Sequence, residues 1–84
     1  MKKYVAVGIF TSDERGAVGG ISDFIMRDSI EEIKSYIEAD YHEDEPLKYD
    51  ERRLEGKEGI TVLRARWTDY EDSVIEWEVK EFEV

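Results

Sequence analysis

The chain has 84 residues, of which 22 are acidic and 12 basic, and its net charge is −10. This length suits a single domain, and we expect one small acidic domain over residues 1–84. The absence of cysteine excludes disulfides, thiolate zinc sites and cysteine nucleophiles. The apolar run at residues 4–10 is too short for a signal peptide or a membrane span, so we expect a cytoplasmic protein without membrane contact.

The first part of the chain is typical of a β-hairpin. Residues 3–10 are nearly all apolar and include β-branched side chains, which predicts a well-buried strand. Residues 12–16 have turn chemistry, and residues 17–26 predict a second strand, antiparallel to the first. The pair Gly19-Gly20 weakens that second strand and suggests a bulge or a close backbone approach.

Residues 28–42 are predicted to form the one helix. Ile30, Ile33 and Ile37 recur at helical spacing, and Tyr41 extends the same stripe by a turn. Such a helix must bury this stripe against another element, and the flanking segments supply a sheet.

Both ends of the helix carry sequence signals. Ser29 and Glu32 have the spacing of a capping box, and Asp28 offers an alternative cap one residue earlier. At the other end, the segment before Pro46 is expected to stop the helix, because the residue before proline is pushed out of the helical region.

Three further strands are expected after the helix. Residues 47–54 are a weak candidate with several charges, typical of an edge strand. Residues 60–68 predict a strong strand, which a loop over residues 69–72 joins to a last strand at residues 74–83.

A register can be proposed for the last hairpin. Pairing residues whose numbers add to 142 places apolar partners on one face and opposite charges on the other, as is favourable across antiparallel strands. The pairs are Trp67 with Ile75, Ala65 with Trp77, Leu63 with Val79, Arg66 with Glu76, and Arg64 with Glu78. This register predicts that both tryptophans face the helix and that the charged ladder is exposed.

These elements predict an α+β fold in which a single helix packs on one face of an antiparallel sheet, in the order ββαβββ. A hairpin followed by a helix is similar in order to several small antitoxin and phage-encoded domains. No motif residues accompany that likeness, so it implies no site and no activity.

The sequence predicts no catalytic site, cofactor or metal site. The glycines of residues 16–20 lack the lysine and hydroxyl residues of a phosphate-binding loop and precede a strand rather than a helix. His42 is the only histidine and is interpreted as a solvated residue at the helix end. Carboxylates are abundant, but catalytic pairs need burial and distinct environments. We therefore expect that the protein is not an enzyme.

Charge is the strongest indication of a partner. Residues 27–51 contain three basic and ten acidic residues, a net charge of −7, and residues 68–84 contain one basic and seven acidic residues, a net charge of −6. This charge argues against direct nucleic-acid binding. We expect a protein-binding module, an inhibitor or decoy acting on a basic or nucleic-acid-binding partner. The candidate contact residues are Glu31, Glu38, Tyr36, Tyr70, Glu76 and Glu78.

Two other interpretations remain open. One helix cannot cover a five-stranded sheet, so the chain could be a structural homodimer joined through a sheet edge or an uncovered sheet face. A small enzyme or ligand carrier is the third. The acidic surface could also serve only to keep the protein in solution.

Overall fold

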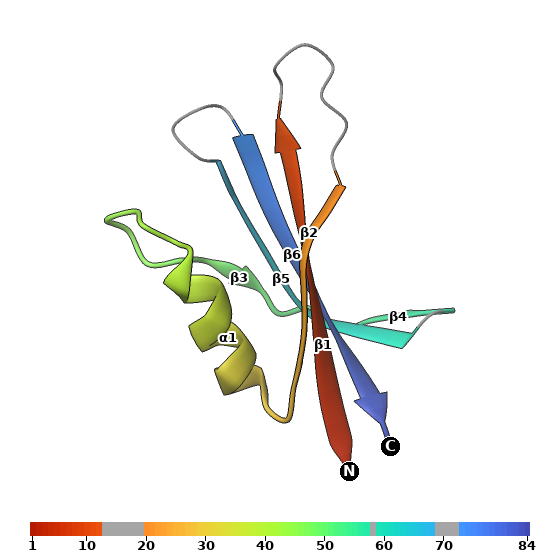
Figure 1. Ribbon diagram of the computed structural model, residues 1–84. Coiled ribbons are helices and arrows are strands. Elements are labelled where there is room, and N and C mark those ends of the chain that lie inside the picture. Colours follow the sequence, from red (N-terminus) through yellow and green to blue (C-terminus); the bar gives the residue numbers. More distant parts are fainter. Residues whose placement is uncertain (13–19, 58, 69–72) are drawn as a thin grey trace.

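Two long β-hairpins form most of the sheet in the computed structural model, which describes residues 1–12, 20–57, 59–68 and 73–84 (Figure 1). The predicted α+β class and antiparallel sheet are confirmed, with one short helix and six strands within these ranges. The hairpin strands are β1 (Lys2–Ser12), β2 (Gly20–Arg27), β5 (Gly59–Thr68) and β6 (Ser73–Glu83).

The two hairpins join through β1 and β6, the first and last strands of the chain. Their pairing runs from Lys2 opposite Glu83 to Ser12 opposite Ser73, and the strand order is β2-β1-β6-β5-β3. The chain termini therefore lie side by side (Figure 1), and the Met1 ammonium is 3.0 Å from the Glu83 carboxylate. This long pairing makes one continuous sheet of the two local hairpins.

The register proposed for the last hairpin is confirmed. Trp67 pairs with Ile75, Ala65 with Trp77, and Leu63 with Val79, while Arg66 and Arg64 lie opposite Glu76 and Glu78. The regular register ends between Thr61 and Leu63, where the pairing shifts by one residue. A shift of this kind marks a β-bulge.

The weak strand expected at residues 47–54 is instead two short strands, so the sheet has six strands rather than five. These are β3 (Tyr49–Asp50) and β4 (Leu54–Gly56), and both pair with β5. The Asp50 carboxylate separates them, because it accepts bonds from the Arg52 backbone N–H at 3.1 Å and from the Arg52 guanidinium at 2.7 Å. An aspartate that bonds the backbone two residues on favours a turn.

The helix α1 (Ile30–Ala39) begins as predicted. Ser29 is the N-cap, and its hydroxyl accepts from the Glu32 N–H at 3.3 Å. The helix ends at Ala39, earlier than the expected His42 and well before Pro46. Its last turn tightens, with the Asp40 N–H bonding the Ile37 carbonyl. Carboxylates at a helix C-terminus oppose the helix dipole, and no basic residue stands in the last turn to offset them.

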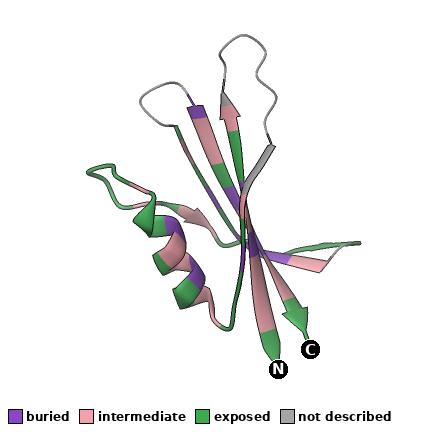
Figure 2. Cartoon of the chain, viewed as in Figure 1, coloured by how far each residue is buried: buried purple, intermediate pink, exposed green. Residues whose placement is uncertain are grey.

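The core lies between α1 and one face of the sheet (Figure 2). Ile33 and Ile37 of α1 are fully buried, and they join a cluster with sheet residues that include Ala6, Trp77 and Val79. Trp77 is 3 % exposed and packs edge-on against Tyr36, with the two ring centroids 5.9 Å apart. Trp67 is half-buried beside this cluster, and Tyr41 packs edge-on against it.

The apolar run of β1 predicts a strand that is well buried, but only one face of β1 is buried. Ala6 and Gly8 are buried on the core face of β1. On the other face, Val5 and Val7 are half-buried and Ile9 is exposed. Successive side chains of a strand point to opposite faces, and one short helix covers only one of them. In the described part of the chain, the second face has no layer above it.

Candidate interaction surface

The sheet face opposite α1, called here the open face, is half apolar. Val5 lies opposite Met26 and Val7 opposite Phe24, so these side chains share that face across β1 and β2. Ile9 continues the row at one end of β1, and Phe82 of β6, which pairs with Lys3, lies at the other end. The apolar patch of the open face is therefore Val5, Val7, Ile9, Phe24, Met26 and Phe82.

These side chains are unusually exposed for apolar residues of a sheet. Phe24 is 62 % exposed and Met26 56 %, and Ile9 and Phe82 are each more than one-third exposed. Together with Glu78 and Lys80, most of the patch lines a groove of about 410 Å³. Apolar patches of this kind on a soluble domain often mark a contact with another molecule.

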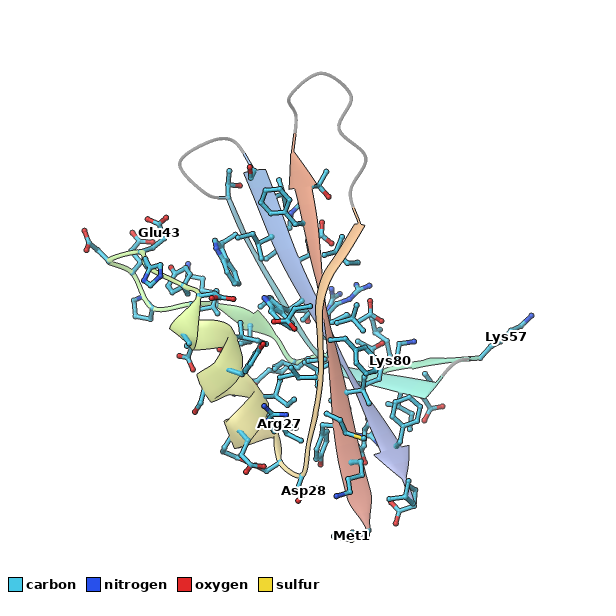
Figure 3. The ribbon with its side chains drawn as sticks, viewed as in Figure 1. Met1, Arg27, Asp28, Glu43, Lys57 and Lys80 are labelled. Atoms are coloured by element: carbon cyan, nitrogen blue, oxygen red, sulfur yellow. The ribbon has the colours of Figure 1, made fainter. Side chains whose placement is uncertain are left out.

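The other half of the open face is charged in both signs. Arg64 lies 3.7 Å from Glu78, and Arg66 lies 3.7 Å from Glu76, as the sequence-based register predicted. Lys80 points to this side of the sheet, away from α1 (Figure 3), and lies 3.8 Å from Glu78. These distances are long for ion pairs, and exposed pairs of this kind contribute little to stability. Glu78 is held more firmly than Glu76, because its Oε1 also accepts from the Thr61 hydroxyl at 2.9 Å.

A second groove of about 470 Å³ adjoins the first across this charged half. Its lining includes Lys48 and Asp50 beside β3 together with the arginine–glutamate pairs. Ile9 and Glu78 line both grooves. The two grooves thus adjoin, with mostly apolar residues over β1 and β2 and mostly charged residues over β6, β5 and β3.

The free edge of the sheet at β2 is protected by side chains. The Phe24 N–H donates to Asp23 Oδ1 at 2.8 Å, and the Met26 carbonyl accepts from the Arg27 guanidinium at 2.8 Å. Phe24 and Met26 are two residues apart, so their backbone groups point to the same side of the strand. Unpaired backbone groups at a sheet edge can pair with a strand of another chain. Here the side chains of Asp23 and Arg27 already bond two of these groups.

Tyr36 of α1 holds both of these side chains in place. Its hydroxyl donates to Asp23 Oδ2 at 2.5 Å, and the Arg27 guanidinium stacks over its ring at 5.6 Å. Figure 3 shows Arg27 on the helix side of β2. The bond to Asp23 raises the pKa of Tyr36, because the neutral hydroxyl is the donor.

The opposite edge is formed by short, charged segments. Arg52 holds the pKa of Asp50 at about 2 through its side-chain and backbone hydrogen bonds. Arg53 lies 3.0 Å from Glu81, and Lys2 lies 2.9 Å from the same carboxylate, so the pKa of Glu81 is lowered. Short strands and charged flanks both discourage edge pairing. The open face is therefore a better docking surface than either sheet edge.

The predicted contact residues lie on two sides of the molecule. Glu76 and Glu78 belong to the charged half of the open face, beside Arg66 and Arg64. Glu31 and Glu38 are exposed on α1, on the far side of the sheet. Tyr36, on the same helix, is half-buried against Trp77. Tyr70 lies outside the described residues.

The helix side carries an exposed acidic surface. Its carboxylates are exposed, and they make no ion pair within residues 1–12, 20–57, 59–68 and 73–84. Glu43 extends away from the sheet in the segment after α1 (Figure 3). The acidic surface consists of Glu31, Glu38, Asp40, Glu43, Asp44 and Glu45.

The apolar run of β1 predicts a well-buried strand, which conceals the apolar patch of the open face. A signal for it exists in the second strand. Phe24 and Met26 alternate with Asp23 and Ile25, which is the two-residue period of a strand with two different faces. Both phases contain apolar residues, so the sheet has more apolar surface than one helix can cover.

Within the ranges that the structure describes, no three histidine or carboxylate side chains converge as metal ligands would. No helix there is long and apolar enough to cross a membrane. Comparison of the chain with protein-family models, with curated proteins and with solved structures found no match.

Proposed function

We propose that this chain is a protein-binding module that docks through the open face of its sheet. The observation that carries the proposal is the exposure of Phe24 and Met26 beside Val5 and Val7. Burying apolar surface is the main favourable term in association, at about 25 cal/mol per Å². Because side chains protect the sheet edges, this face is an exposed apolar surface that a partner could cover.

The arrangement of the face fits protein recognition better than catalysis. Interfaces between proteins combine an apolar centre that contains aromatic residues with a polar rim. Phe24 and Phe82 supply aromatic surface, and the ladder of Arg64, Arg66, Glu76 and Glu78 supplies polar groups at one side. Charges of both signs add specificity, because a wrong partner places like charges together.

The acidic surface of the helix side supports a second candidate, an inhibitor or decoy that binds a basic or nucleic-acid-binding protein. Its six exposed carboxylates make no ion pair with any other described residue, unlike Glu76 and Glu78. Phosphates of duplex DNA recur about every 1.7 Å of helix axis, so a dense carboxylate surface can compete for the same basic groove. This candidate predicts binding that weakens strongly with salt.

One capture experiment separates the two candidates. Tagged wild-type protein and two double variants are incubated with a lysate of the source cells at low and high salt. The bound proteins are then identified by mass spectrometry. Phe24→Thr/Met26→Thr removes the exposed apolar side chains with residues that favour strands. Glu31→Lys/Glu38→Lys reverses charge on the helix side. Circular dichroism verifies that each variant is folded.

The two variants give opposite expectations. A partner that is lost with the threonine variant and retained by the lysine variant supports docking through the open face. A partner lost with the lysine variant and at high salt supports the acidic candidate instead. Capture of the same proteins by all three baits would contradict both proposals.

A further inference from the structure

We propose that a second docking surface lies on the helix side of the sheet, beyond the end of α1, and that its occupant is an arginine-rich segment of a basic partner protein. This surface gives a specific form to the second candidate function, so the proposal rests on the acidic surface and is independent of the open face. A row of partly exposed apolar side chains carries it, together with the carboxylates that border this row.

The apolar part of this surface crosses three neighbouring strands. Phe10 of β1 pairs with Ile75 of β6, and Ile75 pairs with Trp67 of β5, so the three side chains share one face of the sheet. Ile75 and Trp67 pack against the core cluster, which identifies this face as the helix side. Tyr41, which follows α1, packs edge-on against Trp67, with the two ring centroids 5.4 Å apart. These four residues, Phe10, Tyr41, Trp67 and Ile75, are called here the end patch.

The helix stops short of the end patch. It ends at Ala39, whereas β1, β5 and β6 continue beyond it (Figure 1). Phe10 is 41 % exposed, and the other three side chains of the end patch are half-buried. The preceding row of the same face, which centres on Trp77, is buried. The end patch is therefore apolar surface that α1 leaves uncovered.

The segment that borders the end patch is strongly acidic. Residues 38–46 contain five acidic residues and neither lysine nor arginine. Burial, followed by the charges of Glu43 and Glu45, raises the pKa of the Tyr41 hydroxyl, so both carboxylates act on this ring. The C-terminal end of α1 adds a partial negative charge, and its last turn has no basic residue. Charges that oppose a phenolate at Tyr41 attract a cation to the same place.

Arginine is the side chain that suits both parts of this surface. A guanidinium group stacks on aromatic rings, donates to carboxylates through a planar fork, and is more weakly hydrated than an ammonium group. The rings of Tyr41 and Trp67 stand at 77° to each other, so a side chain beside them meets two differently oriented aromatic surfaces. Three neighbouring strands span roughly 10 Å, which is the width of one helix. We therefore expect a single basic segment of the partner to dock here.

Fluorescence anisotropy of fluorescein-labelled octa-arginine, titrated with the full chain in about 0.1 M salt, tests the acidic part of the surface. Glu43→Gln/Glu45→Gln should raise the dissociation constant roughly five- to tenfold, because two carboxylate contacts are lost. The matched control is Glu31→Gln/Glu55→Gln, which removes the same charge from exposed positions in the first turn of α1 and on β4. This control should change the dissociation constant less than about twofold, because salt screens charges beyond about 10 Å.

Two variants of one residue test the aromatic part. Tyr41→Leu keeps an apolar side chain but removes the ring, and should raise the dissociation constant of octa-arginine roughly two- to fivefold, the factor of one exposed cation–aromatic contact. Tyr41→Phe keeps the ring and should bind like wild type. Octa-lysine should bind wild type more weakly than octa-arginine, because an ammonium group lacks the planar fork. Circular dichroism verifies that each variant is folded.

Three outcomes would overturn the inference. The first is a wild-type protein that does not bind octa-arginine at millimolar concentration. The second is equal weakening by the two glutamine pairs, because binding would then follow net charge alone. In that case a captured basic protein that is lost with Glu31→Lys/Glu38→Lys would still support the acidic candidate, and only the end patch would be wrong. The third is equal affinity of Tyr41→Leu and Tyr41→Phe for octa-arginine.

Discussion

The Tyr36 hydroxyl donates to Asp23 Oδ2 at 2.5 Å, which connects the helix to the free edge strand of the sheet. The other oxygen of the same carboxylate accepts from the Phe24 N–H. One carboxylate therefore joins the helix surface to the backbone of β2. The protection of this edge depends on Tyr36 even though Tyr36 does not itself bond the strand backbone.

We expect Tyr36→Phe to loosen this protection. Without the hydroxyl, Asp23 loses the donor that fixes its orientation, and the Phe24 N–H should exchange its hydrogen roughly five- to tenfold faster, the factor that one ordinary hydrogen bond represents. Amide hydrogen exchange measured by NMR would detect the change. Tyr41→Phe serves as the control, because the Tyr41 ring packs on Trp67 far from this edge. Equal exchange at Phe24 in both variants would contradict the proposed role of Tyr36.

Because Gly8 has no side chain, the Trp77 ring can pack directly against the backbone of β1. A Cβ atom at this position would lie 2.9 Å from the nearest ring atom of Trp77, which is closer than side chains normally approach. Gly8→Ala should therefore lower the free energy of unfolding by about 1–3 kcal/mol, the usual cost of overpacking. Urea unfolding followed by tryptophan fluorescence would measure it.

Gly56→Ala is the matched control for that experiment. A Cβ atom there would meet nothing closer than the Gly59 carbonyl at 3.7 Å, so its effect should remain within about 0.5 kcal/mol. If the two alanine variants were equally stable, the close approach of Trp77 to β1 would be wrong.

The sequence predicted best those features that depend on residues close together in the chain. The last hairpin is one example, since a single register satisfies both its apolar face, with Ala65 opposite Trp77, and its charged face, with Arg64 opposite Glu78. The helix cap at Ser29 is another, because it needs only Glu32 three residues later. In both cases the competing arrangements are few. For the hairpin, a register shifted by one residue would bury charges or expose a tryptophan.

Features that depend on the whole molecule could not be predicted in the same way. The early end of the helix at Ala39 reflects an unfavourable balance of charge at its C-terminus, which the apolar stripe through Tyr41 concealed. The open face depends on the length of the helix and on the pairing of β1 with β6, which joins the two ends of the chain.

The helix cap gives a prediction about stability. Ser29→Ala removes the hydroxyl that accepts from the Glu32 N–H, and should lower the free energy of unfolding by about 1 kcal/mol. Ser35→Ala changes the same residue type at an exposed position within the helix, where alanine is the better helix former. That control should be neutral or slightly stabilising in chemical denaturation. A loss of the same size in both variants would argue against the cap.

Tyr49 gives a prediction about alkaline pH. Burial, followed by the nearby charge of Glu38, raises the pKa of its hydroxyl above the ordinary value of about 10. A raised folded-state pKa means that the neutral phenol is favoured by folding. Its contribution to stability is therefore fully present below about pH 10, and is lost as the pH rises toward the folded-state pKa.

The stability of wild type should consequently fall more steeply than that of Tyr49→Phe as the pH increases from about 9 to 12, because phenylalanine has no proton to lose. Urea unfolding at a series of pH values measures both slopes, and ultraviolet absorbance reports when phenolate forms. Repeating the series at high salt separates this effect from repulsion among the acidic residues, which salt screens. Parallel slopes for the two proteins would mean that Tyr49 ionises as easily in the folded chain as in the unfolded one, and that burial against Glu38 does not govern its titration.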